Sequence, residues 1–118
     1  MSDSIRIPKG DSRTLVFDAI DGSTGNYITA AELATWNIQF WTENFVKNSV
    51  DEPLQVYTQA GDGDEMFIKV ELLSTETDPT GNDCVRDLLL HYKLSLYKDD
   101  NPPLVITGSA GDLVFTEE

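Results

Sequence analysis

The chain is poor in thiols, imidazoles and basic side chains, and each shortage excludes a class of protein. Its 118 residues include one Cys, Cys84, and one His, His91, so neither an intramolecular disulfide nor a Cys/His zinc cluster can form. Eight Lys and Arg stand against 21 Asp and Glu, which gives a formal net charge of −13. This charge disfavours binding to nucleic-acid backbones and to anionic membranes, so we expect neither as a partner.

Long apolar runs are also missing. The run at 88–90 is only three leucines, whereas a membrane-spanning helix needs about 20 apolar residues. The first four residues, Met-Ser-Asp-Ser, contain neither a basic segment nor an apolar run, so we expect no signal peptide of the usual kind. A soluble protein is therefore expected.

The chain has enough apolar material for one hydrophobic core. Domains cluster at about 100 to 150 residues, which predicts a single domain over residues 1–118. Apolar residues make up 40% of the sequence and include two Trp, four Tyr and five Phe. They occur in patterned segments, which argues against a disordered chain.

Alternation of apolar and polar side chains predicts β-strands. Over 34–40 the apolar residues recur every second position, as in a half-buried strand. The same period recurs over 66–72 and over 88–96, and the latter is the expected central strand. Shorter strands are predicted at 4–7, 13–20, 54–58, 104–108 and 113–116.

Clusters of Gly, Pro, Asp and Asn separate these segments and predict turns, including one at 108–111. Thr29 and Glu32 have the spacing of a capping box, which predicts one helical turn over 29–33. Seven or eight short strands in a domain of this size predict an all-β fold, a β-sandwich. The order of the strands does not follow from the sequence.

Several segments occur in an order found in a known family. Residues 5–17 read Ile-Arg-Ile-Pro-Lys-Gly-Asp-Ser-Arg-Thr-Leu-Val-Phe, a short strand, a Gly-Asp corner and an alternating strand. The helical turn at 27–31 and the strand at 36–40 follow, and late in the chain come a long strand with Tyr92 and a final hairpin near Gly108. Over residues 4–116 this order resembles the small immunoglobulin-like domain of tailed-phage structural proteins, such as the N-terminal domain of a baseplate upper protein.

The resemblance implies an immunoglobulin-like β-sandwich and a role in the virion. Such domains serve in tails, baseplates or capsid decoration, and their partners are copies of themselves and other virion proteins. The resemblance implies no catalytic residues. Two segments, 42–51 and 76–86, are longer than a minimal member needs, so the loops between strands are expected to differ.

A catalytic triad would have to use His91, the single histidine. A triad could pair it with Cys84, but no nucleophile-elbow sequence surrounds either residue. We expect Cys84 to be a small packed residue and His91 to lie on the outer face of the strand at 88–96. No catalytic residue is assigned, and the protein is expected not to be an enzyme.

The acidic sequence at 62–65, Asp-Gly-Asp-Glu, begins like a calcium-binding loop. The pattern stops after two ligands, because Met66 and Phe67 occupy the next ligand and glycine positions. A cation would need help from Asp83 or from residues 99–101. We therefore expect a solvated acidic turn and assign no metal and no cofactor.

The two tryptophans are expected on opposite faces of one strand. Trp36 belongs to the inward face and is predicted to lie in the core. Trp41 follows Phe40 and points outward, where it could contact another subunit, bind a host-surface glycan, or be covered by the loop at 42–51. Other apolar residues on nominally outer faces are Phe67, Leu73, Leu89 and Tyr97, and residues 2–7 are expected to be able to add a strand to a neighbour.

The acidic residues concentrate in turns. We therefore interpret the net charge as an indication of the ionic environment in which the protein works, and not of an active site. An excess of Asp over Lys is typical of proteins from halophiles and their viruses. The alternative is an ordinary acidic phage protein, and the sequence leaves both open.

Overall fold

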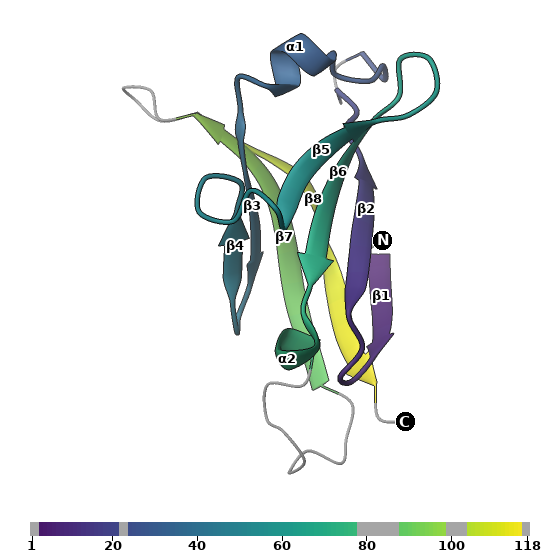
Figure 1. The fold of residues 1–118 in the computed structure, drawn as a ribbon, viewed down its shortest axis with the longest axis vertical. Helices are drawn as coiled ribbons and strands as arrows, with labels where there is room; N and C mark the ends of the chain where they lie inside the picture. The colour runs from purple at the N-terminus through teal and green to yellow at the C-terminus, as the bar shows by residue number, and fades with distance from the viewer. Residues whose placement is uncertain (1–2, 22–23, 78–87, 99–103, 117–118) are drawn as a thin grey trace.

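The computed structural model describes residues 3–21, 24–77, 88–98 and 104–116. These residues form two β-sheets that pack face to face, with short helices at opposite ends of the sandwich (Figure 1). The larger sheet has the strand order β1-β8-β7-β3-β4, and the smaller has the order β2-β6-β5. Neighbouring strands are antiparallel except β1 and β8, which are parallel. The prediction of an all-β sandwich is confirmed.

The bounds of the elements can be followed in Figure 1. They are β1 Asp3–Pro8, β2 Arg13–Asp18, α1 Ala30–Leu33, β3 Asn37–Thr42, β4 Val46–Asn48, β5 Val56–Ala60, β6 Met66–Leu72, α2 Ser74–Thr77, β7 Leu88–Lys98 and β8 Leu104–Thr116.

The strands with strong alternation are found where the sequence places them. The prediction for β6 is confirmed to the residue, and those for β1, β2, β5 and β7 are confirmed to within a few residues. The strand predicted at 34–40 begins only at Asn37. The helical turn α1 continues in backbone hydrogen bonds from Thr35 N–H to Glu32 and from Trp36 N–H to Leu33, so residues 34–36 cannot join the sheet.

The predicted final hairpin is wrong, because β8 is one continuous strand. Leu94 of β7 pairs with Ser109 and Ser95 pairs with Thr107, so Gly108 is an extra residue in the ladder. Glycine inside a strand often marks such a bulge, because its backbone bends without steric cost from a side chain. The glycines at 108 and 111 therefore lie within a strand and form no turn.

Two elements were not predicted from the sequence. The strand β4 lies within the segment 42–51. The helix α2 begins two residues before the segment 76–86 and ends at its second residue. Both segments were expected to be loops. Elements of three or four residues are too short to display a hydrophobic period, and these two, unlike α1, have no capping pattern that was recognised in the sequence.

An aromatic cluster occupies the space between the sheets. The rings of Phe40 and Tyr92 stack with their centroids 5.7 Å apart, and the ring of Phe17 from the smaller sheet lies 5.9 Å from that of Tyr92. Such pairs stabilise the fold beyond their buried area by about 0.5–1.5 kcal/mol each. The surrounding buried apolar residues include Ile7, Leu15, Ile38, Val56, Val70, Leu72, Leu94, Leu113 and Phe115.

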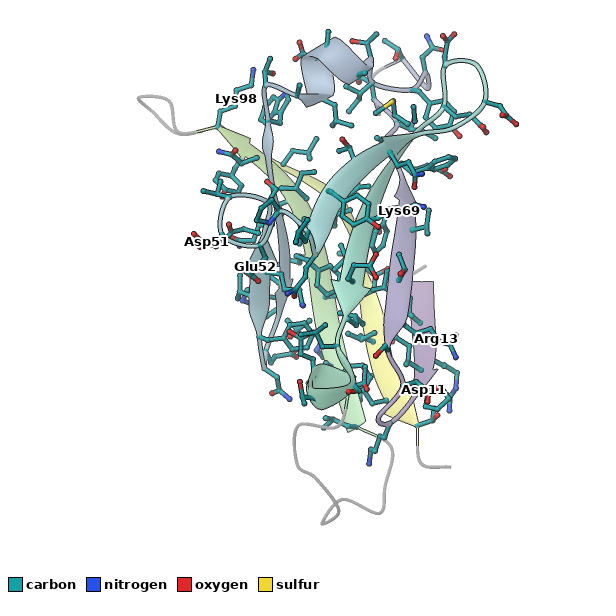
Figure 2. All side chains as sticks on the ribbon, viewed as in Figure 1. Asp11, Arg13, Asp51, Glu52, Lys69 and Lys98 are labelled. Atoms are coloured by element: carbon teal, nitrogen blue, oxygen red, sulfur yellow. The ribbon has the colours of Figure 1, made fainter. Side chains whose placement is uncertain are left out.

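Trp36 was predicted in the core but lies half-buried at its margin. Because it stands before β3, its ring packs beside α1 and its Nε1 donates a hydrogen bond of 3.3 Å to Glu32. The Nζ of Lys98, labelled in Figure 2, lies 4.5 Å from the centroid of the ring.

The helix α2 closes the opposite end of the sandwich. Thr77 is fully buried, and its hydroxyl accepts a hydrogen bond from the Gly10 N–H at 3.0 Å and contacts the Asp11 carbonyl oxygen at 3.0 Å. This contact ties α2 to the turn between β1 and β2. Asp11 and Arg13 form an exposed ion pair at the same turn (Figure 2).

Candidate interaction surface

The hairpin of β3 and β4 determines which side chains face out of the larger sheet. The Thr42 hydroxyl accepts hydrogen bonds from the N–H groups of Asn44 and Phe45, and the Thr42 N–H donates to the Phe45 carbonyl. This tight turn sets the register of the hairpin. It pairs Trp41 with Val46 on the outer face and Phe40 with Lys47 on the inner face.

Trp41 therefore lies on the outer face, as the sequence predicts. Its cross-strand neighbour on the other side is Lys93 of β7, whose Nζ lies 5.9 Å from the centroid of the Trp41 ring. The indole is half-buried. Val46, the cross-strand partner of Trp41 in β4, is 47% exposed.

Further apolar side chains follow Val46 along the chain. Val50 is 59% exposed and Leu54 is 87% exposed, both in the connection between β4 and β5. The segment lies at one side of the sandwich, where β4 ends the larger sheet and β5 ends the smaller (Figure 1). We call this surface the β4–β5 edge and define it as Trp41 with residues 46–54 and 56–60.

The four edge strands differ in their protection against pairing with another chain. The edge strand β1 contains Arg6 and Pro8, and β2 contains Arg13 and Asp18; charges and proline discourage the addition of a further strand. The edge strand β5 has the sequence Val-Tyr-Thr-Gln-Ala, without charge or proline. The edge strand β4 contains the inward-pointing Lys47, so β5 is the least protected of the four edge strands.

The N-terminal strand already has a partner within the chain. β1 pairs in parallel with β8 from Asp3 to Pro8, and Ile7 is buried in the core. The predicted addition of residues 2–7 to a neighbouring subunit would have to use the other edge of this strand or displace it.

His91 is exposed on β7 and pairs with carboxylates. Its Nδ1 lies 2.6 Å from Oε2 of Glu43, its backbone N–H donates to Oε1 of the same residue at 2.7 Å, and its Nε2 lies 3.8 Å from Asp112. The hydrogen bond to Glu43 and its negative charge raise the pKa of His91, and the same hydrogen bond lowers the pKa of Glu43. The predicted outer-face position of His91 is confirmed. Cys84 lies outside the described residues, so its pairing with His91 stays untested.

The acidic sequence at 62–65 forms the turn between β5 and β6. The Glu65 carboxylate accepts a hydrogen bond of 2.9 Å from the Asp62 N–H, and Gly63 adopts a φ of 60°. Glu65 thus closes its own loop. In the described ranges, no three His, Cys, Asp or Glu side chains gather in a way that could hold a metal ion. Asp83 and residues 99–101 lie outside those ranges.

A cleft lies beside this turn at the α1 end of the molecule. It is lined by Gly25, Asn26, Tyr27, Thr29, Ala30, Ala60, Gly63, Asp64, Glu65 and Met66. The Tyr27 hydroxyl lies 3.4 Å from Asp18, and partial burial together with the charges of Asp18 and Glu65 raises the pKa of Tyr27. The ring of Phe67, predicted on the outer face, packs edge-on against Tyr27 at 6.3 Å.

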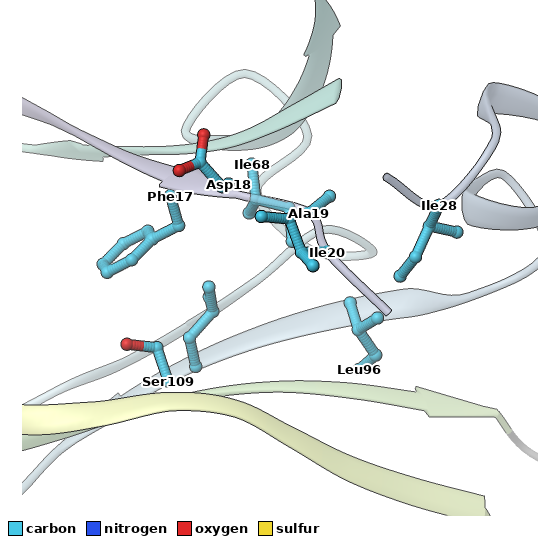
Figure 3. A pocket seen from close by; sticks show the side chains of 9 residues that line it. Phe17, Asp18, Ala19, Ile20, Ile28, Ile68, Leu96 and Ser109 are labelled. Carbon is cyan, nitrogen blue, oxygen red and sulfur yellow. The ribbon is translucent and has the colours of Figure 1, made fainter. Parts of the chain in front are cut away.

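A smaller cavity of about 50 Å³ opens between the sheets next to the β8 bulge (Figure 3). Its walls are mainly apolar and include Phe17, Ile28 and Leu96, and Asp18 and Ser109 are polar residues of the lining. The space suffices for a few water molecules and is too small for an organic ligand of ordinary size.

The outer face of the smaller sheet carries a polar group centred on Glu71. Its carboxylate accepts hydrogen bonds of 2.6 Å from the hydroxyls of Thr14 on β2 and Tyr57 on β5. These two hydrogen bonds lower the pKa of Glu71, and the carboxylate raises the pKa of Tyr57. The group links all three strands of the sheet.

Sequence reasoning missed one polar group inside the sandwich. Lys47 of β4 is fully buried and contacts Glu76 of α2 and Gln55 before β5. No sequence signal reveals this group, because a lysine between Val46 and Asn48 reads as exposed. Of the apolar residues predicted on outer faces, Leu73 and Leu89 are exposed at 43% and 55%, and Tyr97 is half-buried.

No family model matches the chain, and no curated protein matches its sequence. None of the helices in the described part of the chain is long and apolar enough to cross a membrane.

Proposed function

We propose that the protein is a structural component of a tailed-virus particle, with an immunoglobulin-like sandwich that works by contact between subunits. The sequence resemblance to phage structural domains supports this role, as do the two-sheet architecture and the helical turn before β3. The continuous β8 departs from the resemblance, which implies a final hairpin. The partners are copies of the chain and other virion proteins, in a tail, baseplate or capsid decoration.

The β4–β5 edge is the observation that carries this proposal. Val46 exposes an apolar side chain beside Trp41, and Val50 and Leu54 expose theirs in the connection between β4 and β5. The edge strand β5 that follows has no charge and no proline. Exposed apolar side chains grouped near an open strand edge are typical of contact surfaces between proteins. We propose that this edge is buried in the assembled particle.

Electron microscopy of purified particles, with the chain traced in the map, tests the proposal. We expect the β4–β5 edge against a neighbouring subunit. Leu54→Asp and Val50→Asp should reduce incorporation into particles, whereas the control Leu89→Asp, on the outer face of β7, should not. Recovery of the protein only as a free monomer absent from particles would refute the role.

The alternative partner is a host-surface glycan bound by Trp41. Lys93 lies over one face of the indole, so stacking of a sugar on that face would require Lys93 to move. Binding on a glycan array that disappears in Trp41→Ala would favour this alternative over the structural role.

A further inference from the structure

Three side chains of complementary chemistry meet inside the sandwich behind β4. The Lys47 side chain is 2% exposed, and its Nζ lies 2.7 Å from Oε1 of Glu76. The same Nζ donates a hydrogen bond to Oε1 of Gln55. The amine therefore contacts both a carboxamide and a carboxyl group in a site that is largely shielded from water.

Each of these groups is held by a different part of the fold. The register of the β3–β4 hairpin points Lys47 inward. The Gln55 carbonyl accepts a hydrogen bond of 2.7 Å from the Glu71 N–H of β6, which fixes the backbone of Gln55. The Glu76 Oε1 accepts a hydrogen bond of 2.7 Å from the Leu73 N–H at the start of α2. Groups positioned in this way react as if at very high concentration.

We propose that Lys47 and Gln55 join in an intramolecular isopeptide bond, formed by the chain itself with Glu76 as the catalytic acid and base. The buried ion pair supplies the starting point. The reaction begins with transfer of one proton from Nζ of Lys47 to the Glu76 carboxylate along their contact, which leaves both groups neutral. The product of this transfer is a neutral amine, which is nucleophilic, beside a neutral carboxylic acid.

The neutral Nζ attacks Cδ of Gln55, the carbon that carries the contacted Oε1. Glu76 donates its proton to the carboxamide as the new bond forms and accepts a proton from Nζ. The bond between Cδ and Nε2 then breaks, and its electron pair leaves with the nitrogen as ammonia. A primary amine and a carboxamide thus become a secondary amide and ammonia, with no oxidant and no further reactant.

The bond joins the edge strand β4 to the residue that precedes β5. It therefore connects the larger sheet to the smaller one covalently. The reaction occurs once per chain and is independent of the proposed role in a virus particle.

Mass spectrometry of the purified full-length chain tests the bond without any variant. We expect an intact mass lower by one ammonia molecule than the sequence requires. Trypsin does not cleave after an amidated lysine, so residues 14–69 should remain a single peptide that is lighter by one ammonia. A full intact mass, with separate peptides that end at Lys47 and begin at Asn48, would overturn the proposal.

Variants assign the loss of ammonia to this cluster. Lys47→Met removes the amine and Glu76→Gln removes the acid, so both should have the full mass of their sequences. The control Lys69→Met, on the other face of β6, should keep the deficit. A deficit that persists in Lys47→Met would place the loss elsewhere and refute the bond, and one that persists in Glu76→Gln would refute the catalytic role of Glu76. If Lys47→Met fails to fold, the tryptic peptides of the unsubstituted chain show whether the bond between Lys47 and Gln55 is present.

Discussion

Lys47 and Glu76 form an ion pair of 2.7 Å between an edge strand and the helix that closes one end of the sandwich. The pair connects β4 to α2 inside the sandwich, although the two residues lie far apart in the sequence. Neither element has enough residues to be stable by itself. The contact therefore contributes to the position of both.

Loss of Glu76 should destabilise the fold strongly. Glu76→Ala removes both the acid that forms the proposed isopeptide bond and the acidic partner of Lys47, so the variant retains a buried amine without its partner. Breaking a buried pair in this way costs about 3–5 kcal/mol. Urea unfolding at neutral pH measures the change. The control Glu52→Ala, in the half-exposed connection before β5, should change the free energy of unfolding by less than about 0.5 kcal/mol. Equal stability of the two variants would contradict the assigned importance of the pair.

The strands that could be predicted are those whose pattern is local. The inward residues of β6, Met66 to Leu72, are apolar at every second position, and this period gives its bounds even though Phe67 on the outer face is also apolar. Trp41 could be placed on the outer face in the same way, because it follows the buried Phe40.

The exposure of Val46 and the burial of Lys47 could not be predicted from hydropathy. The apolar residue is exposed and the charged one is buried, because the Thr42 turn sets the register and Glu76 and Gln55 satisfy the amine. These partners come from later in the chain, and a local pattern contains no information about them. The same holds for Gly108, where pairing with β7 turns an expected hairpin into a bulged strand.

Tyr57→Phe should raise the pKa of Glu71 toward its ordinary value, because one of the two hydroxyls that stabilise the carboxylate is lost. A carboxyl pKa lowered in the folded state stabilises the fold above the unfolded pKa of about 4.3, and this contribution disappears as pH falls through the folded pKa. The stability difference between wild type and variant should therefore shrink on acidification. NMR titration of the Glu71 carboxyl measures the pKa. Tyr27→Phe, the control, should leave it unchanged.

Glu43→Gln should lower the pKa of His91 toward about 6.5, because the hydrogen bond and charge of Glu43 are the main causes of its elevation. A raised histidine pKa stabilises the fold fully below the unfolded pKa and ceases to do so as pH rises through the folded pKa. His91 is the single histidine of the chain, so its ring protons can be assigned directly by NMR. Asp112→Asn should have a smaller effect, since Asp112 lies 3.8 Å away. A larger effect from Asp112→Asn would contradict this order.

Thr77→Val should detach α2 from the turn between β1 and β2. The substitution keeps the shape of the side chain but leaves the Gly10 N–H and the Asp11 carbonyl without the hydroxyl. A buried polar group without a partner costs about 1–3 kcal/mol, measurable by urea unfolding. Hydrogen exchange of the Gly10 amide should become faster. The control Thr75→Val, exposed on the same helix, should preserve both properties.

Salt should raise the melting temperature, because acidic side chains lie close together at the β5–β6 turn and repel one another. Asp62, Asp64 and Glu65 lie within this turn, in a chain of net charge −13. The screening length falls from about 10 Å at 0.1 M salt to about 3 Å at 1 M, so the repulsion within the turn weakens over that range. Calorimetry across this range measures the effect in wild type and in Asp62→Asn/Asp64→Asn, whose dependence on salt should be weaker. The control Asp11→Asn, at the opposite end of the sandwich, should retain the dependence. A melting temperature independent of NaCl would remove the argument for a halophilic setting.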